Sequence, residues 1–154
     1  MSHGTVEAIY ISEKAGKPMI HLDEVTALKG LGLKGDRYCS GEGSFNRKSP
    51  GKRQVTLMNA LFFEESGFEF SQSRRNIFTK DVELMYLIGR EFKIGDALFR
   101  GVKYCDPCQR PNKLLRIKKS FKETFLDRGG LVAEILEGGV IRTGDVVVPP
   151  AKSY

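Results

Sequence analysis

The sequence predicts a mainly β fold: a closed or nearly closed β-barrel with a few short helices. Three observations lead to this prediction. Short stretches rich in β-branched and aromatic residues recur along the chain. Glycine-rich corners separate them, and the chain holds 17 glycines in 154 residues. Only two segments have a helical pattern. A set of many short strands is expected to close into a barrel, because closure removes its exposed edges.

The first three predicted strands are recognised by their composition. They cover residues 5–12, 53–58 and 76–80. Each combines Val, Ile or Thr with an aromatic or long apolar residue, which is the composition that a pleated, half-buried surface favours. We therefore expect these three segments to form part of the barrel wall.

Two later segments predict pairs of strands. Residues 91–104 predict two strands across a turn at Gly95, with a bulge or a close approach of another backbone at Gly101. Residues 131–149 repeat the arrangement, with a turn at Gly138 and a further glycine corner before the last strand. These segments supply the remaining wall of the predicted barrel.

Two segments predict helices. Residues 59–67 predict a short helix with Asn59 as its N-cap and Gly67 just beyond its end. Residues 112–129 predict a longer helix that Gly129 ends, because four apolar residues fall on one face: Leu114, Ile117, Phe121 and Phe125.

Length and cysteine usage bound the class of protein. A chain of 154 residues can bury a core of its own, and we expect a single domain over residues 1–154. No stretch approaches the roughly 18 apolar residues of a membrane span, and the N-terminus has no apolar run of signal-peptide length. Three cysteines, two of them close together, are typical of a reducing compartment. We therefore expect a cytoplasmic protein without membrane contact.

The charge distribution indicates an anionic partner. The net charge is +6, and the polar segment 38–53 has no apolar period, which is typical of a functional loop. Basic residues precede this loop, line it and begin the next strand: Lys34, Arg37, Arg47, Lys48, Lys52, Arg53, Arg74 and Arg75. Each one alone fits a solvated surface. The adjacent pairs at 52–53 and 74–75 stand where loops become strands, and a planar guanidinium suits phosphate oxygens.

The Cys105-x-x-Cys108 pair admits several interpretations. A zinc site would need further ligands, for which the sequence offers the distant Cys39 and two histidines, His3 and His21. A thiol–disulfide couple usually stands at a strand-to-helix turn of a βαβ fold, which this pattern does not predict. Two half-buried thiols without chemistry are also consistent with the spacing.

The fourth interpretation is a single working thiolate at Cys108. Arg110 and Lys113 follow it closely, and cations at that range lower the pKa of a thiol. Cys105 ends a strand and is expected to pack partly against the barrel. The spacing alone leaves the four interpretations open.

The ordered set of four stretches resembles a MOSC domain, the domain found at the C-terminal end of molybdenum-cofactor sulfurases and in amidoxime-reducing proteins. The stretches are residues 30–38, 53–58, 74–108 and 128–147, and together they span most of the chain. The resemblance implies a β-barrel that binds molybdenum cofactor, a pterin with a dithiolene and a terminal phosphate. It implies a function in sulfur transfer to the cofactor or in cofactor-dependent reduction.

The resemblance also implies site residues. Cys108 matches the family cysteine, which serves as a molybdenum ligand through the cofactor or as a persulfide sulfur carrier, and is the candidate catalytic residue. The candidate cofactor-binding residues are the family matches together with the neighbouring basic residues: Asp36, Arg37, Lys52, Arg53, Gln54, Arg74, Arg75 and Asn76. At Tyr38-Cys39 the chain departs from the His-Ala of many relatives. The sequence contains no pyridoxal-phosphate domain, so the resemblance implies a separate cysteine desulfurase as sulfur donor, with a molybdoenzyme as a possible recipient.

A competing interpretation is a non-enzymatic basic barrel that binds nucleic acid. Stacking platforms for bases would then interleave with the cations, and only Phe45 and Tyr38 are aromatic among them. The sequence therefore favours a small anionic pterin over nucleic acid.

Overall fold

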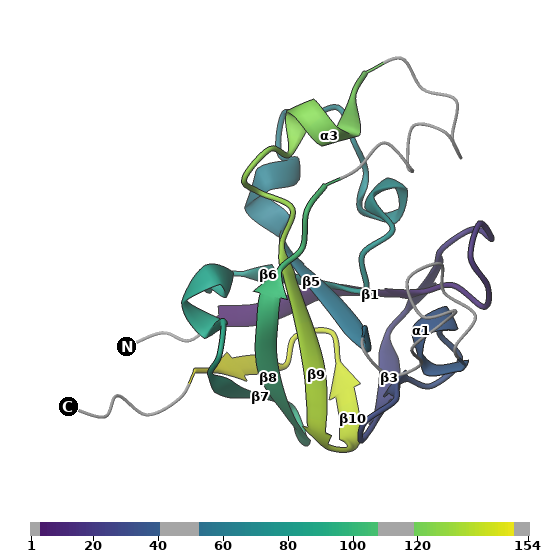
Figure 1. Ribbon diagram of the computed structural model, residues 1–154, viewed down its shortest axis with the longest axis vertical. Helices are drawn as coiled ribbons and strands as arrows, with labels where there is room; N and C mark the ends of the chain where they lie inside the picture. Colours follow the sequence, from purple (N-terminus) through teal and green to yellow (C-terminus); the bar gives the residue numbers. More distant parts are fainter. Residues whose placement is uncertain (1–3, 41–52, 108–118, 150–154) are drawn as a thin grey trace.

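The fold is a closed barrel of seven strands. A computed structural model describes residues 4–40, 53–107 and 119–149 (Figure 1). The barrel strands neighbour one another in the order β11-β7-β8-β9-β5-β6-β1, and a pairing of β11 with β1 closes the ring. Their bounds are β1 (Gly4–Ile11), β5 (Val55–Asn59), β6 (Ile77–Lys80), β7 (Glu91–Ile94), β8 (Ala97–Tyr104), β9 (Leu131–Glu137) and β11 (Val146–Val148). The predicted β-barrel is thereby confirmed.

The strand pairs of the barrel are antiparallel except one. β5 and β6 run parallel, with Leu57 opposite Ile77, so both strands begin at the same end of the barrel. Among the described residues, four further strands lie outside the ring. β2 (Ile20–Leu22) pairs with β1, and a small sheet holds β10 (Gly139–Arg142), β3 (Glu24–Leu28) and β4 (Gly32–Leu33) in that order.

Alternation along the strands divides the apolar residues between two cores. On β5, Val55 and Leu57 belong to the cluster that fills the barrel, whereas Met58 belongs to a second cluster outside it. Burying one such side chain stabilises the fold by roughly 1.5–3 kcal/mol. Because successive side chains of a strand point to opposite faces, β5 contributes apolar side chains to both cores.

The second core is a layer of phenylalanine rings over the outer face of β5 and β6. It includes Phe78 on β6, Phe63 on η1 (Ala60–Phe63) and Phe121 on α3 (Phe121–Thr124). The Phe63 and Phe78 rings meet edge to face, with centroids 5.4 Å apart. α3 lies beyond one end of the barrel (Figure 1).

The strand pair predicted over residues 91–104 agrees with the structure in detail, as β7 and β8, whereas the strands predicted as a pair over residues 131–149 do not pair: β9 lies in the barrel and β10 pairs with β3 outside it. Gly95 stands in the turn between β7 and β8, and the register of β8 against β9 shifts after Gly101. A Cβ atom at Gly101 would lie 2.1 Å from the carbonyl oxygen of Leu87, so only glycine allows the two backbones to approach. The predicted bulge and the predicted close approach therefore occur at the same residue.

The helix predicted over residues 112–129 is wrong as one continuous helix. Ser120 is extended (φ −73°, ψ 117°), and its hydroxyl accepts a hydrogen bond from the Glu123 N–H, so it caps α3. A serine that caps a helix interrupts any helix that precedes it. Residues 112–118 lie outside the described part of the chain.

The helix predicted over residues 59–67 is reduced to the single 3-10 turn η1. The Asn59 side chain does not cap it and instead accepts a hydrogen bond from the Thr79 hydroxyl at 3.3 Å. Sequence analysis missed other short elements, among them β2 to β4, α1 (Arg37–Ser40), η2 (Phe70–Ser73) and η3 (Leu84–Leu87). Within the described residues, no helix has both the length and the apolar character that crossing a membrane requires.

Candidate functional site

The Asp36 carboxylate anchors the turn that follows β4. It is fully buried and accepts hydrogen bonds from the Ser12 N–H at 2.9 Å and from the Tyr38 N–H at 3.4 Å. Burial raises the pKa of Asp36, while the Arg37 guanidinium, 3.1 Å away, acts in the opposite direction. The carboxylate thus holds the start of α1 against the end of β1.

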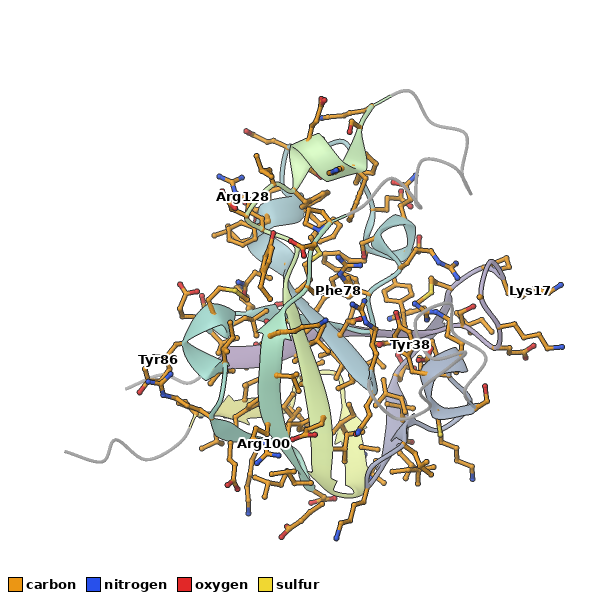
Figure 2. All side chains as sticks on the ribbon, in the orientation of Figure 1. Lys17, Tyr38, Phe78, Tyr86, Arg100 and Arg128 are labelled. Carbon is orange, nitrogen blue, oxygen red and sulfur yellow. The ribbon has the colours of Figure 1, made fainter. Side chains whose placement is uncertain are left out.

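The Arg37 side chain connects this turn to the start of β6. Its Nη2 donates to the backbone carbonyl of Arg74 at 2.9 Å and to the Tyr38 hydroxyl at 3.1 Å, and the side chain is almost fully buried. Arg74 has a left-handed backbone (φ 64°, ψ 20°), and its Nη1 donates to the Lys17 carbonyl. Tyr38 and Lys17 lie on the same side of the barrel in Figure 2. Arg37 therefore directs donors to other parts of the protein and fixes the backbone at Arg74.

Asn76 joins three neighbouring strands. Its Oδ1 accepts from the Thr56 N–H at 3.0 Å and from the Thr56 hydroxyl at 3.1 Å, and its Nδ2 donates to the Tyr10 carbonyl at 3.1 Å. The side chain is fully buried. Gln54, on the other side of β5, accepts from the Ile135 N–H at 2.8 Å. Both amides act as internal connections between strands.

Arg75 fastens the end of β8 to the start of β6. Its Nε donates to the Gly129 carbonyl at 2.9 Å, and its Nη2 donates to the Asp106 carbonyl at 3.2 Å. A third hydrogen bond, from Nη1 to the Ser73 carbonyl, is longer at 3.4 Å. With 6% of its surface exposed, Arg75 is a buried cation that backbone carbonyls solvate.

Arg53 and Cys105 bring a guanidinium and a thiol together. Arg53 Nη1 lies 3.7 Å from Cys105 Sγ, and Arg53 is partly exposed whereas Cys105 is fully buried. The Cys105 N–H donates to the Gly130 carbonyl at 2.9 Å, which ties the residue to the start of β9. Cys105, which the sequence predicts to pack partly against the barrel, is therefore fully buried.

Apart from Gln54, whose amide oxygen accepts from the Ile135 N–H, the described candidate residues form two adjoining groups. Asp36, Arg37, Arg74 and Asn76 form one polar group, in which the Asn76 amide also supports the Asp36 carboxylate. The other group has three members: Arg53, Arg75 and Cys105. The chain from Arg74 to Asn76 connects the two groups. Cys108 and Lys52, and the cations Arg110 and Lys113, lie outside the described residues.

Sequence analysis missed Thr56 and Ser12, the internal polar partners of Asn76 and Asp36. A signal for Thr56 exists in the sequence, because a lone polar residue between Val55 and Leu57 faces the side of the strand opposite to the barrel core.

Cys39 lies three residues after Asp36. Partial burial, together with the negative charge of Asp36, raises the pKa of the Cys39 thiol.

Two alternative functions can be compared with the structure. Tyr38 is buried, with 4% of its surface exposed, so it offers no open ring face to a nucleic-acid base. Phe45, the other aromatic residue considered, lies outside the described residues. In the described ranges, no three His, Cys, Asp or Glu side chains gather as a metal site would require.

Comparisons with known proteins agree on the fold. The chain is similar over 97% of its length to 97% of the YuaD protein of Bacillus subtilis, with 17% identity and a TM-score of 0.79. It is similar over 97% of its length to 71% of Escherichia coli YiiM (17% identity, TM-score 0.61). Geobacillus stearothermophilus YiiM matches over 75% of its own length and 96% of this chain (14% identity, TM-score 0.66). At these identities the likeness shows a shared fold alone.

Sequence comparisons supply the family. No curated protein matches the sequence. A family model for the MOSC domain matches residues 52–148, which is more than half of the chain and includes every strand from β5 to β11. The chain therefore belongs to the MOSC domain family.

Proposed function

We propose that this chain binds molybdenum cofactor and takes part in sulfur transfer to the cofactor or in cofactor-dependent reduction. Membership of the MOSC family supports the proposal. The observation that carries it is the contact of Arg53 with Cys105, with Nη1 3.7 Å from Sγ, beside the segment that leads to Cys108. A cation suited to phosphate and a soft sulfur suited to a thiophilic metal stand together there.

The side chains of the two groups are chemically suited to the anionic part of the cofactor. A pterin phosphate is anionic, and arginine presents a planar fork that matches phosphate oxygens. Arg53 is partly exposed, whereas Arg74 is buried. When bound, the cofactor would supply a redox-active molybdenum centre with a position for a terminal sulfur. We assign its anionic groups to Arg53, with Lys52 as a further cation of the same segment.

The remaining candidates have a different role in this proposal. Arg37, Arg74, Arg75 and Asn76 donate to backbone carbonyls inside the protein. Asp36 and Gln54 accept from backbone N–H groups. We propose that these six side chains shape the site and position Arg53, because a buried donor that already has a carbonyl partner gains little from a ligand.

Cys108 is the proposed working thiol. As a sulfur carrier, its thiolate attacks the outer sulfur of a persulfide on a cysteine desulfurase. A new S–S bond forms at Cys108 while the S–S bond of the donor breaks, and the donor cysteine leaves as a thiolate. No net oxidation occurs. A molybdoenzyme would be the natural recipient of the sulfurated cofactor.

Purification from two hosts tests the proposal. The protein is prepared from a host that makes the cofactor and from a strain that does not, and molybdenum and oxidised-pterin fluorescence are measured per chain. We expect both signals only in the first preparation. Arg53→Ala should weaken pterin phosphate binding about tenfold to a hundredfold, because a charged hydrogen bond is lost. Arg142→Ala, an exposed arginine on β10, is the matched control and should bind as the parent does.

Cys108→Ser separates the thiol from the binding groups. It should keep pterin phosphate binding but lose sulfur loading from a desulfurase, followed by mass spectrometry of the intact chain. Absence of pterin from both preparations, together with salt-sensitive binding to duplex DNA, would overturn the proposal in favour of a nucleic-acid-binding barrel.

A further inference from the structure

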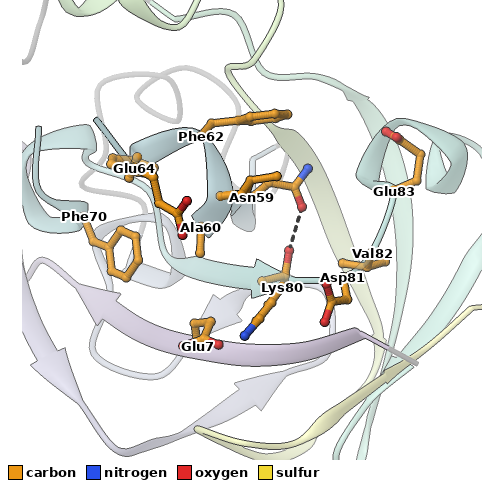
Figure 3. A pocket seen from close by; sticks show the side chains of 13 residues that line it. Glu7, Asn59, Ala60, Phe62, Glu64, Phe70, Lys80, Asp81, Val82 and Glu83 are labelled. Carbon is orange, nitrogen blue, oxygen red and sulfur yellow. Dashed lines mark hydrogen bonds between the residues drawn. The ribbon is translucent and has the colours of Figure 1, made fainter. Parts of the chain in front are cut away.

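A groove of about 690 Å³ lies at the other ends of β5 and β6 from the candidate site. Its lining includes Asn59, which ends β5, and Lys80, which ends β6 (Figure 3). The candidate residues Arg53 and Arg74, by contrast, precede these parallel strands. A groove of this volume is in the range that small molecules occupy.

The walls of the groove are largely apolar and firmly held. Phe62, Phe63 and Phe70 line it, together with Val82 beyond β6. The Phe63 and Phe70 rings meet edge to face at 5.0 Å, and Phe70 stacks on the buried Phe78 at 4.4 Å. Rings fixed in this way offer a preformed surface to a flat apolar group.

The charge around the groove is opposite in sign to that of the whole chain. Four carboxylates line it, against the single ammonium of Lys80: Glu7, Glu64, Asp81 and Glu83. In the described part of the chain none of the four forms an ion pair. Arg128 lies over the Phe62 ring at 5.1 Å but does not line the groove. A cleft lined by one sign of charge attracts ligands of the other sign, although the chain as a whole carries +6.

A fixed polar group completes the lining. The Thr79 hydroxyl, which is fully buried, donates to Asn59 Oδ1 at 3.3 Å, and this contact sets the orientation of the amide (dashed line in Figure 3). The Asn59 NH2 group has no hydrogen-bond acceptor among the described residues. It can therefore donate to an acceptor on a ligand.

From these features we infer that the groove binds a small organic cation, a molecule that joins a protonated nitrogen to a flat apolar body. The carboxylates would attract the cation and the phenylalanine walls would hold the apolar body. The inference does not rest on the proposed function, because the groove shares no lining residue with the candidate cofactor site. A pterin phosphate, being anionic, is not expected to enter it.

Amide NMR of the ¹⁵N-labelled full chain tests the inference with three probes of one shape. 2-Naphthylmethylammonium should give saturable shifts at residues 59–64 and 79–83. Neutral 2-naphthalenemethanol should bind more weakly, and anionic 2-naphthoate should give no shifts there. Glu64→Gln and Asp81→Asn should each weaken binding of the cation about 2- to 5-fold. Asn tolerates the left-handed backbone at Asp81 (φ 59°), so this variant retains the fold.

Glu91→Gln, which removes an exposed carboxylate on β7 outside the groove, is the matched control and should leave the affinity unchanged. Equal binding of the cation and the neutral alcohol would overturn the inference, as would shifts confined to other parts of the chain. Shifts produced by a hexalysine peptide but not by the small cation would assign the groove to a protein partner and also overturn it. Cation binding by a chain that retains no pterin would uphold this inference and refute the proposed function alone.

Discussion

Arg75 Nη2 donates to the backbone carbonyl oxygen of Asp106 at 3.2 Å, and the two residues are 31 positions apart in the sequence. The same guanidinium donates to the Gly129 carbonyl at 2.9 Å. One buried side chain at the start of β6 therefore holds both the segment that leads toward Cys108 and the segment that leads into β9. This arrangement makes Arg75 a positioning residue for the candidate site.

Arg75→Gln should lower the free energy of unfolding by about 2–4 kcal/mol, because charged hydrogen bonds to buried carbonyls are lost. The free energy of unfolding of Arg75→Lys should lie between those of the parent and of Arg75→Gln, since an ammonium keeps the charge but lacks the planar fork. Urea unfolding measures the loss. Alkylation of Cys105 should also become faster in Arg75→Gln, because the segment next to it loses its anchor.

Arg90→Gln is the control for Arg75→Gln. Arg90 is exposed and also donates to a backbone carbonyl, that of Tyr86, but outside the site. Its loss should cost under about 1 kcal/mol. Equal losses in the two variants, with Cys105 alkylated at the parent rate in both, would contradict the role given to Arg75.

Gly129→Ala should destabilise the protein through direct contact. A Cβ atom at Gly129 would lie 2.0 Å from the Cys105 carbonyl oxygen and 2.7 Å from a Pro107 side-chain carbon. Because the obstacle is backbone, relief requires the 105–107 segment to move, at a cost of about 2–3 kcal/mol or more. Thermal unfolding measures the loss.

Gly89→Ala is the matched control for Gly129→Ala. Gly89 has a positive φ of 76°, but nothing lies within 4 Å of a Cβ placed there. Its cost should be about 1–2 kcal/mol, from backbone conformation alone. A larger loss at Gly89 than at Gly129 would show that the contact with Cys105 is easily relieved.

The barrel could be predicted from the sequence because its signals are local. Alternating apolar residues, the turn at Gly95 and the bulge at Gly101 all lie within one or two strands. The helix over residues 112–129 was wrong for an equally local reason, since apolar spacing gave no weight to Ser120 as a cap. Two-residue strands such as β4 carry too few residues to show any period.

The candidate site was less predictable, because the partner of a polar side chain depends on the tertiary fold. The sequence marked Arg37, Arg75 and Asn76 alike as candidate ligands of an anionic cofactor. In the fold their donors point to carbonyls of Arg74, Asp106 and Tyr10, which lie 31 to 66 positions away in the chain. No sequence pattern distinguishes an arginine that binds a ligand from one that binds a distant carbonyl.

Asp36 should make stability depend on pH in a defined direction. Burial raises the pKa of its carboxyl in the folded protein, so the folded state binds the proton more tightly than the unfolded chain. Its contribution is therefore complete below the unfolded pKa of about 3.9 and is lost as pH rises through the higher folded pKa. Asp36→Asn has no titrating carboxyl at this position, so its free energy of unfolding should lack this contribution to the pH dependence.

Urea unfolding of the parent and Asp36→Asn between pH 4 and pH 7.5 tests this direction. The difference in free energy of unfolding between the two proteins should be largest near pH 4 and should shrink toward neutral pH. Asp96→Asn, at an exposed aspartate, is the control for general charge effects. A difference that grows with pH would mean that Arg37 and the N–H donors outweigh burial at Asp36.

The three cysteines should react with iodoacetamide at different rates. Burial and the charge of Asp36 raise the pKa of the Cys39 thiol, so its alkylation should be slow at pH 7 and should accelerate as pH rises. Cys105 is fully buried, so its alkylation should require opening of the surrounding structure. Cys108 is followed by Arg110 and Lys113, and nearby cations lower a thiol pKa.

We therefore expect the order Cys108, then Cys39, then Cys105, measured at pH 7 by mass spectrometry of peptides from timed samples. Cys108→Ser should remove the fast phase, whereas Cys105→Ser should leave it in place, because the fast thiol is expected to act alone. Equal rates at Cys105 and Cys108, with a disulfide between them under mild oxidation, would support a thiol–disulfide couple. Slow alkylation of both that a chelator relieves would support zinc. Either result would remove the single working thiol on which the proposed sulfur transfer depends.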